Sequence, residues 1–126
     1  MKNINSLKNS KEFREVYENG KSLANRLLIV YVLKKEGPFR LGITVSRKVG
    51  GSVVRHRVTR LIRESYISLK NEFPDGLWVV VIARPSCREC SQKEIENALL
   101  HMINRHGIKN DKKSNQQVND KANMVL

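Results

Sequence analysis

The sequence has no apolar run long enough to cross a membrane, because its longest, LWVVVIA at 77–83, is only strand-sized. The N-terminal stretch MKNINSLKNSKEF lacks the apolar region of a secretory signal. Two cysteines in a basic chain without a signal suggest reduced thiols in a cytosol. We therefore expect a cytoplasmic protein with no membrane partner.

Motifs for enzyme chemistry are also missing. The chain shows no credible Ser/His/Asp set and no Gly-rich phosphate loop of the GxGxxG or Walker type. Its acidic residues are scattered along predicted helix surfaces. If the protein takes part in catalysis, its side chains are not expected to supply the reactive groups, so we assign no catalytic residue.

Negative charge is scarce. The 126 residues include 12 acidic and 24 basic ones, which gives a net charge of +12 and a sequence pI near 10.1. So many positive charges repel one another in the folded protein. Such an excess is therefore usually kept for binding an anionic partner, either nucleic acid or an anionic membrane surface. From Arg40 to Arg63 there are seven basic residues and no acidic one, so this window carries +7 of the total.

The residue pattern predicts an α+β fold with a small mixed sheet. Three helices are expected: one from a cap at Asn9 or Ser10 to about Asn19 with Gly20 as its stop, one from an N-cap at Ser52 to about 71–72, and one from a Ser91–Glu94 capping box to Gly107. Strands are expected at 27–34, 39–46 and 77–83. The first two should pair as a hairpin, and the third, apolar throughout, should lie at the centre with both faces covered.

The domain organisation is simple. Residues 1–8 read as a loose basic lead-in, and residues 1–107 should form a single domain. From residue 108 to 126 the chain is polar and without periodicity, so we expect a disordered tail. The expected order is α-β-β-(β)-α-β-α with about four strands.

The predicted second helix separates two kinds of residue. At about 100° per residue, one stripe gathers the side chains expected to face the sheet: Val54, Val58, Leu61, Ile62, Ser65 and Leu69. The opposite side displays His56, Arg57, Arg60 and Arg63, while Arg55 lies at the edge of the stripe. An ordinary solvated face mixes signs. Here Glu64 is the only acidic neighbour, and arginines near the helix start oppose the macrodipole, which favours a polyanion-binding surface.

Three other features leave alternatives open. Gly50-Gly51 before this helix is either a phosphate seat or a plain turn. Phe13, Tyr17 and Tyr31 are either core residues or a platform for stacking single-stranded bases. The spacing C-x2-C-x10-H-x4-H, from Cys87 to His106, approaches a zinc site. We prefer two loop thiols and two helix-surface histidines, because no strand pair surrounds the cysteines, and we expect no zinc.

Four segments, in order and spacing, resemble the protein subunit of bacterial ribonuclease P. They are F-x-x-V-Y-x-x-G (Phe13 to Gly20), GITVSRKVG (Gly42 to Gly50), V-x-R-x-R-x-x-R-L-I-R-E (Val53 to Glu64) and VVVIARP (Val79 to Pro85). The resemblance covers roughly Leu7 to Arg105, and the arginine helix is its most specific motif.

This resemblance implies a single RNA-binding domain that works with a catalytic RNA to remove the 5′ leader from precursor tRNA. The RNA would supply the active site and, with the substrate, hold most of the Mg²⁺, while the protein strengthens substrate and metal affinity. No obligate protein partner is expected. The implied RNA contacts are Arg47, Lys48, Arg55, His56, Arg57, Arg60 and Arg63, and the implied leader-binding cleft is walled by Phe13, Tyr17 and Tyr31. The family's fold also implies a left-handed crossover around the arginine helix.

The chain departs from the family pattern at three positions. His56 stands where Asn is usual, Gly51 also stands where Asn is usual, and Thr59 replaces a basic residue. These changes affect particular hydrogen bonds rather than the binding mode.

Two other functions come from the charge and the helix alone. The positive charge is also compatible with a non-catalytic protein that binds structured RNA, such as a ribosomal one. A DNA-binding regulator lacks the helix-turn-helix partner that should precede the arginine helix.

Overall fold

The structure, a computed structural model, describes residues 5–108. The described residues form three α-helices, four β-strands and two short 3₁₀-helices: α1 (Ser10–Asn19), β1 (Lys21–Ala24), β2 (Leu28–Lys34), β3 (Arg40–Thr44), α2 (Ser52–Leu69), η1 (Lys70–Glu72), β4 (Leu77–Ala83), η2 (Pro85–Glu89) and α3 (Gln92–His106). The α+β class, the three helices and the mixed sheet are confirmed. The predicted tail lies outside the described residues from residue 109 on, whereas Ile108 packs against the core.

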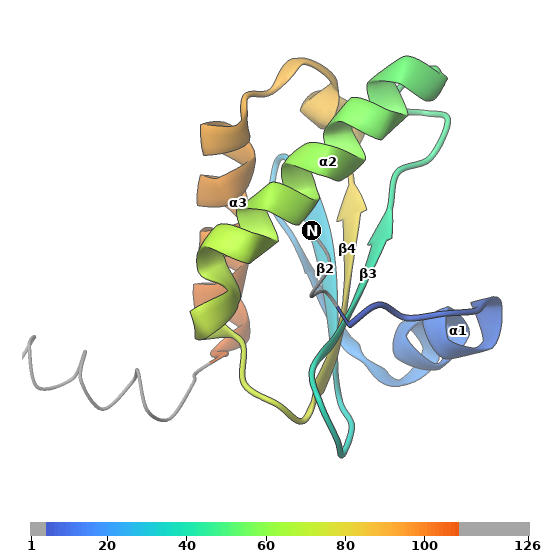
Figure 1. Ribbon diagram of the computed structural model, residues 1–126, viewed down its shortest axis with the longest axis vertical. Coiled ribbons are helices and arrows are strands. Elements are labelled where there is room, and N and C mark those ends of the chain that lie inside the picture. Colours follow the sequence, from blue (N-terminus) through green and yellow to red (C-terminus); the bar gives the residue numbers. More distant parts are fainter. Residues whose placement is uncertain (1–4, 109–126) are drawn as a thin grey trace, which may run out of the picture.

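One mixed sheet runs through the molecule in the order β1-β2-β4-β3 (Figure 1). β4 is its inner apolar strand, and all of its residues except Ile82 are buried, as the sequence predicts. β1 was not predicted, because KSLA is largely exposed and has little apolar character. Its strand conformation comes from antiparallel pairing with β2, which places Lys21 opposite Val32 and Ala24 opposite Ile29.

The predicted hairpin between 27–34 and 39–46 is wrong. β2 and β3 each pair with β4, β2 in antiparallel and β3 in parallel orientation. The turn between β2 and β3 passes the start of β4, where Gly76 N–H donates to Gly37 O at 2.8 Å and Lys35 N–H donates to Gly76 O at 3.0 Å. A central strand needs hydrogen-bonding neighbours on both edges, and β4 obtains them by separating the two strands that are adjacent in sequence.

β3, α2 and β4 form a crossover unit between two parallel strands. In Figure 1 both strands point upward, α2 crosses in front of the sheet, and β4 lies to the left of β3. A right-handed connection would place β4 to the right in this view. The crossover is therefore left-handed, as the family resemblance implied and contrary to the general rule.

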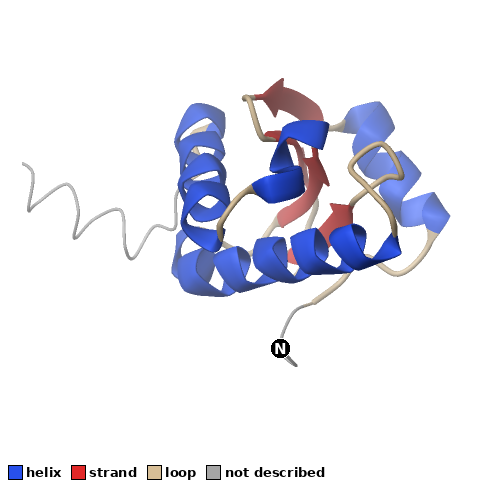
Figure 2. Ribbon diagram, turned by 90° about the horizontal axis from the view of Figure 1, so that it is seen from above, coloured by secondary structure: helices blue, strands red, loops and turns tan. Residues whose placement is uncertain are grey.

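The sheet separates two layers of unequal size. Seen from above, α2 and α3 cover one face and α1 covers the other (Figure 2). The main core fills the first layer with fully buried side chains, among them Val58, Ile62, Ile95, Leu99 and Met102. The smaller layer under α1 buries Leu7, Val16, Trp78 and Val80. These two layers leave the outer surface of α2 and the region beside α1 as separate exposed surfaces.

The segment just before α1 is not the loose lead-in that the sequence suggested. Ser6 forms an isolated parallel bridge with Leu41 of β3, and Leu7 N–H donates to Leu41 O at 3.0 Å. Leu7 itself is buried. Residues 5–8 thus extend the edge of the sheet beside β3.

The helix ends agree with most of the predicted caps. Asn9 caps α1 by accepting from Glu12 N–H, Ser91 and Glu94 form the expected capping box, and Gly107 ends α3 in the left-handed conformation. For α2 the N-cap is Gly51, not Ser52. This helix ends at Leu69, earlier than predicted, and the chain continues as η1.

Candidate nucleic-acid interface

α2 presents the two faces that its sequence predicted. Val58, Leu61 and Ile62 are buried against the core. Ser65 is buried beside them, and its hydroxyl is satisfied by donating to Leu61 O at 2.8 Å. Tyr66 is also buried, although it was not among the predicted inner residues, and its ring stacks on Phe39 with centroids 5.4 Å apart. This packing fixes which side chains α2 can show to a partner.

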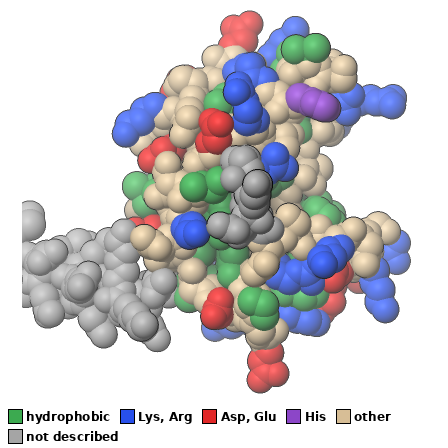
Figure 3. All heavy atoms as spheres, in the orientation of Figure 1, with side chains coloured by type: hydrophobic (Ala, Val, Ile, Leu, Met, Phe, Trp, Pro, Cys, Tyr) green, Lys and Arg blue, Asp and Glu red, His purple; other side chains and the backbone are tan. Residues whose placement is uncertain are grey.

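The outer face of α2 is cationic. Arg60 and His56 are exposed, Arg63 is half-buried, and Arg47 and Lys48 are exposed in the loop before the helix. Neither of the two ion pairs found among the described residues involves an arginine of α2. In Figure 3, basic side chains gather over the first turns of α2 at the upper right, with no acidic side chain among them. We call these five residues the cationic surface.

Arg57 has a different position from the one the sequence suggested. Its guanidinium donates to Cys90 O at 3.2 Å and to Arg88 O, so it binds the backbone of η2 and its C-cap. Arg55 is half-buried, and its Nε is buried without a hydrogen-bond partner. Of the four arginines of the helix, Arg60 is therefore the exposed one, Arg57 is held by the backbone near η2, and Arg55 and Arg63 are half-buried. The role of all four in RNA contact stays a prediction.

Gly50 and Gly51 at the start of α2 meet different surroundings. A Cβ on Gly50 would lie 2.8 Å from Val54 Cβ, so this position has room for no side chain. A Cβ on Gly51 would have no atom within 4 Å. Gly51 caps the helix with no side-chain hydrogen bond, and the first turn contains no acidic residue. The N-terminus of α2 is thus open and positive, which suits an anion.

The three predicted aromatic residues come together on the other face of the sheet. Tyr17 of α1 contacts Tyr31 of β2 edge to face with centroids 5.1 Å apart, and Phe13 lies 6.3 Å from Tyr17. The Tyr17 hydroxyl shares a 3.3 Å hydrogen bond with Thr44 Oγ1 of β3. A shallow cavity of about 450 Å³, lined in part by Phe13, Tyr17 and Thr44, opens beside them. We call this the aromatic cleft.

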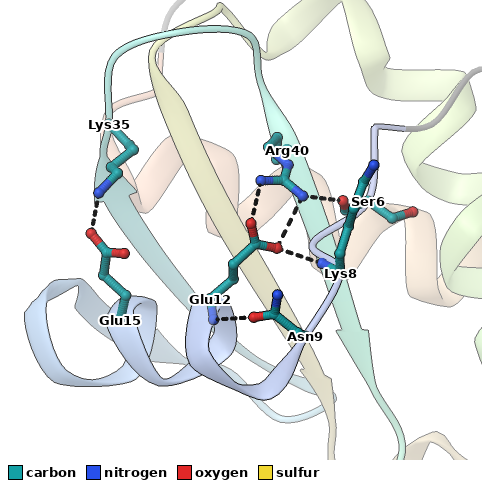
Figure 4. A network of polar contacts seen from close by, with 7 residues as sticks. All are labelled: Ser6, Lys8, Asn9, Glu12, Glu15, Lys35 and Arg40. Atoms are coloured by element: carbon teal, nitrogen blue, oxygen red, sulfur yellow. Dashed lines mark hydrogen bonds and ion pairs between the residues drawn. The ribbon is translucent and has the colours of Figure 1, made fainter.

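An ion-pair network that the sequence did not reveal holds α1 over the sheet (Figure 4). Glu12 accepts from Arg40 at 2.7 and 3.0 Å and from Lys8 N–H at 2.6 Å, and Glu15 pairs with Lys35. The Arg40 guanidinium beside Glu12 lowers the pKa of that carboxyl. Arg40, counted in the sequence as part of the basic window, is therefore neutralised and is not part of the cationic surface. The only sequence hint was its position on the same face of β3 as Thr44.

The cysteines and histidines of the zinc-like spacing point to structural roles. Cys87 and Cys90 are both buried, and burial raises the pKa of Cys87 to about 11. Cys87 Sγ lies 3.1 Å from Leu27 O, and His106 Nε2 lies 2.9 Å from Val30 O. In residues 5–108 no three His, Cys, Asp or Glu side chains are placed to hold a metal ion together. The same residues include no helix long and apolar enough to cross a membrane.

Known proteins share both the sequence and the fold. A sequence model of the family described as Ribonuclease P matches residues 1–107. The ribonuclease P protein component of Alkaliphilus metalliredigens is 49% identical over 104 residues, covering 82% of this chain and 94% of that protein. The one from Bacillus mycoides is 44% identical over 115 residues, covering 90% and 100%.

The fold is similar to that of solved structures of RNase P proteins. The RNase P protein of Staphylococcus aureus matches with a TM-score of 0.76 and 33% identity, covering 83% of this chain and 97% of that one. The RNase P protein of Thermotoga maritima matches with a TM-score of 0.73 and 30% identity, covering 79% and 96%. The matches span most of the described chain, which includes both the arginine helix and the aromatic residues.

Proposed function

Because the chain belongs to the family of ribonuclease P protein components, whose role is in tRNA 5′ processing, we propose that it acts beside a catalytic RNA subunit that removes the leader of precursor tRNA. The observation that carries this proposal is the pairing of two different surfaces in one small domain. One is cationic and the other aromatic. A partner that needs both is a structured RNA with a single-stranded extension.

The cationic surface is proposed to bind the RNA subunit. Arg60, Arg63 and His56 line the outer face of α2, and Arg47 and Lys48 precede it. Arginine suits phosphate because its planar fork can donate two parallel hydrogen bonds. None of these side chains forms an ion pair with an acidic side chain of the described residues, so the charges of the arginines and Lys48 stay available to the partner. Each phosphate contact would release counterions and make the affinity depend on salt.

The aromatic cleft is proposed to receive the single-stranded leader. Bases without a pairing partner stack on tyrosine and phenylalanine rings, and this contact tolerates different sequences. Thr44 of the cleft is followed after two residues by Arg47 and then Lys48. A strand leaving the cleft at Thr44 would therefore meet the cationic loop that leads to α2.

The chemical step is proposed to belong to the RNA. The cleft and the cationic surface offer cations, aromatic rings and hydroxyl groups, but no paired carboxylates or activated nucleophile within reach of each other. The Mg²⁺ ions of the reaction are proposed to be held mainly by the RNA subunit and the substrate. By neutralising phosphates and positioning the leader, the protein would raise the affinity of the assembly for both substrate and metal.

Reconstitution with a bacterial ribonuclease P RNA tests this function. The expected result is that the protein increases leader removal from precursor tRNA at low Mg²⁺, and that its effect on binding is greater for substrate with a leader than for mature tRNA. A ribosomal-type RNA-binding protein would bind folded RNA with no dependence on the leader. An assembly that cleaves no better than RNA alone would rule the proposal out.

A further inference from the structure

A second hollow lies away from both proposed surfaces, between the β1–β2 turn and α3. Its volume is about 460 Å³, within the range of small-ligand sites. It is lined by the turn residues 25–27 and by Glu94, Asn97, Ala98 and His101 from α3. Because α3 covers the sheet face opposite α1 (Figure 2), this hollow is separate from the aromatic cleft. We call it the α3 groove.

Asn25 fixes the walls of the α3 groove. Its side-chain oxygen accepts from Leu27 N–H at 3.1 Å and from Leu28 N–H at 2.9 Å, which determines the orientation of the amide. Its Nδ2 therefore faces α3, where it lies 3.0 Å from Ala98 O and 3.2 Å from His101 Nδ1. Because Nδ2 can only donate, His101 Nδ1 accepts, and the neutral ring carries its proton on Nε2. The turn and the helix are thus joined before any ligand arrives.

Several polar atoms of the groove make no hydrogen bond within the part of the chain that the structure describes, although Arg26 lies close enough to Glu94 for their charges to attract. Glu94 Oε1 accepts from Ser91 N–H at 2.9 Å and from the Ser91 hydroxyl at 3.2 Å, which leaves Oε2 free. These bonds lower the pKa of Glu94 and keep it ionised at neutral pH. The Asn97 amide, the Arg26 guanidinium and His101 Nε2 make no hydrogen bond to the described residues. Leu27 and Ala98 supply apolar lining between these groups.

The groove is connected to the arginine helix through η2. The Ser86 hydroxyl of η2 donates to Arg26 O, and Arg57 of α2 donates to the backbone of Arg88 at the other end of η2. Arg84 also lies here, and its guanidinium donates to Asn25 O at 2.7 Å. A basic path of arginines therefore leads from α2 over η2 to the edge of the groove, which is the direction an RNA strand bound to α2 could follow.

We propose that the α3 groove binds the base of one unpaired nucleotide of the RNA partner. This rests on the proposed function, because it takes RNA as the partner. A carboxylate in the lining repels a bare phosphate but accepts hydrogen bonds from the N–H groups of a base. Asn97 can both donate to and accept from a base edge, and Arg26 at the turn can meet the adjoining phosphate. Guanine fits best, because one of its two neighbouring donors, N1–H and the amino group, can donate to the free Oε2 of Glu94 and the other to the amide oxygen of Asn97.

Measuring how tightly variants bind ribonuclease P RNA, and how that affinity depends on salt, distinguishes a contact to a base from a general attraction between charges. Asn97→Ala is expected to weaken binding by about tenfold without changing the salt slope, since a base contact releases no counterion. Arg26→Ala should instead lower the slope by about one. Asn104→Ala is the matched control, because Asn104 is exposed on the same helix seven residues further on and does not line the groove. Equal affinities for the Asn97 and Asn104 variants would overturn the proposal.

Crosslinking locates the contact independently of affinity. Asn97→Cys can be labelled selectively with a photo-crosslinker, because the native thiols are buried and their pKa values are raised. In the assembled complex it should crosslink to a defined unpaired nucleotide, preferably a guanine. Glu36→Cys, exposed in the β2–β3 turn, should not reach that nucleotide. Failure of the label on the Asn97→Cys variant to reach any RNA would reject the groove as a base site.

The outcomes distinguish this proposal from the function it rests on. If the unaltered protein stimulates leader removal while the Asn97 variants behave like the controls, the groove proposal fails and the function stands. If the unaltered protein gives no stimulation, the proposed function fails. Binding and crosslinking to the same RNA then still decide whether the groove holds a nucleotide.

Discussion

Arg40 of β3 and Glu12 of α1 form a two-bonded ion pair between the sheet and the helix that covers it, with distances of 2.7 and 3.0 Å. The Arg40 guanidinium also lies 5.0 Å from the centre of the Trp78 ring. Phe13 follows Glu12 directly in α1, and Tyr17 lies little more than one turn further on. The pair therefore sets the position of the helical wall of the aromatic cleft.

Glu12→Gln should reduce stability in a pH-dependent manner. The pKa of Glu12 is lowered from 4.5 in the folded protein, chiefly by Arg40, so its stabilising effect is present above pH 4.5 and is lost as the pH falls through the lowered value. The variant should be less stable than the unaltered protein at pH 7, and this difference should shrink on acidification. Thermal melts across this range measure it. Glu18→Gln, exposed on the same helix, is the control, and a difference independent of pH would contradict the assignment.

Arg60→Ala should weaken RNA binding and reduce the salt slope by about one counterion. Arg60 is exposed at the middle of the outer face of α2 and has no protein partner from the described residues, so its removal should leave the fold intact. Binding to ribonuclease P RNA at several salt concentrations gives the slope. Lys34→Ala, exposed at the end of β2, should leave it nearly unchanged. A normal slope for the Arg60 variant would argue against a direct phosphate contact.

Arg57→Ala should mainly lower the stability of the folded protein. Its guanidinium holds the backbone at Arg88 and Cys90, and hydrogen bonds from a charged group are worth about 1.5–3 kcal/mol each. Loosening η2 should also expose Cys87 and Cys90, which are buried in the native protein. Denaturation and the rate of reaction with a thiol reagent report both effects. If Arg57→Ala instead matches Arg60→Ala in salt slope with no loss of stability, its main role is to contact RNA.

The different positions of Arg57, Arg60 and Arg40 show where sequence reasoning reaches its limit. Helical periodicity correctly separated the buried and outer faces of α2, because that property is local. Whether an arginine on the outer face stays free depends on which distant backbone or carboxylate the fold brings to it. Arg57 binds the segment at η2 and Arg40 binds α1, each about 30 residues away in sequence. A local repeat of apolar and charged residues cannot predict contacts between such distant segments.

The sheet shows the same limit. The inner position of β4 followed from its unbroken apolar run, and the caps of α1 and α3 followed from short local motifs. The pairing of β2 with β3 was predicted from a turn and two suitable flanking strands, which is also local reasoning. β4 enters between them from more than 30 residues downstream, so the correct order depends on a non-local contact. The residues alone left Phe13, Tyr17 and Tyr31 open between core positions and a stacking platform, and only the family resemblance placed them together as the wall of a cleft, since that wall combines a helix and a strand.

Tyr31→Ala should reduce affinity for leader-bearing tRNA more than for mature tRNA. Stacking of a base on an aromatic ring contributes about 1–3 kcal/mol. Tyr31→Phe is the matched control, because it keeps the ring that contacts Tyr17 and removes only the hydroxyl. The Phe variant should bind both substrates normally. An equal loss for the two substrates with Tyr31→Ala would remove the cleft from leader binding.

Gly51→Asn should increase both helix stability and RNA affinity. Gly51 is the N-cap of α2 with φ −71° and ψ −175°, a backbone conformation that asparagine adopts without strain, and a Cβ there would meet no atom within 4 Å. Asparagine at an N-cap accepts from a backbone N–H of the first turn and exceeds glycine by a few tenths of a kcal/mol. The added amide would also stand beside the cationic surface, at a position where the family resemblance implies asparagine.

Gly50→Ala provides the contrast for this test. Its Cβ would lie 2.8 Å from Val54 Cβ, so this substitution should destabilise the start of α2 and weaken RNA binding. Thermal melts and RNA titrations of the two variants measure both effects. If Gly51→Asn binds RNA more weakly than the unaltered protein, the partner approaches the backbone too closely for a side chain. In that case glycine at position 51 is a requirement of this interface and not a lost contact.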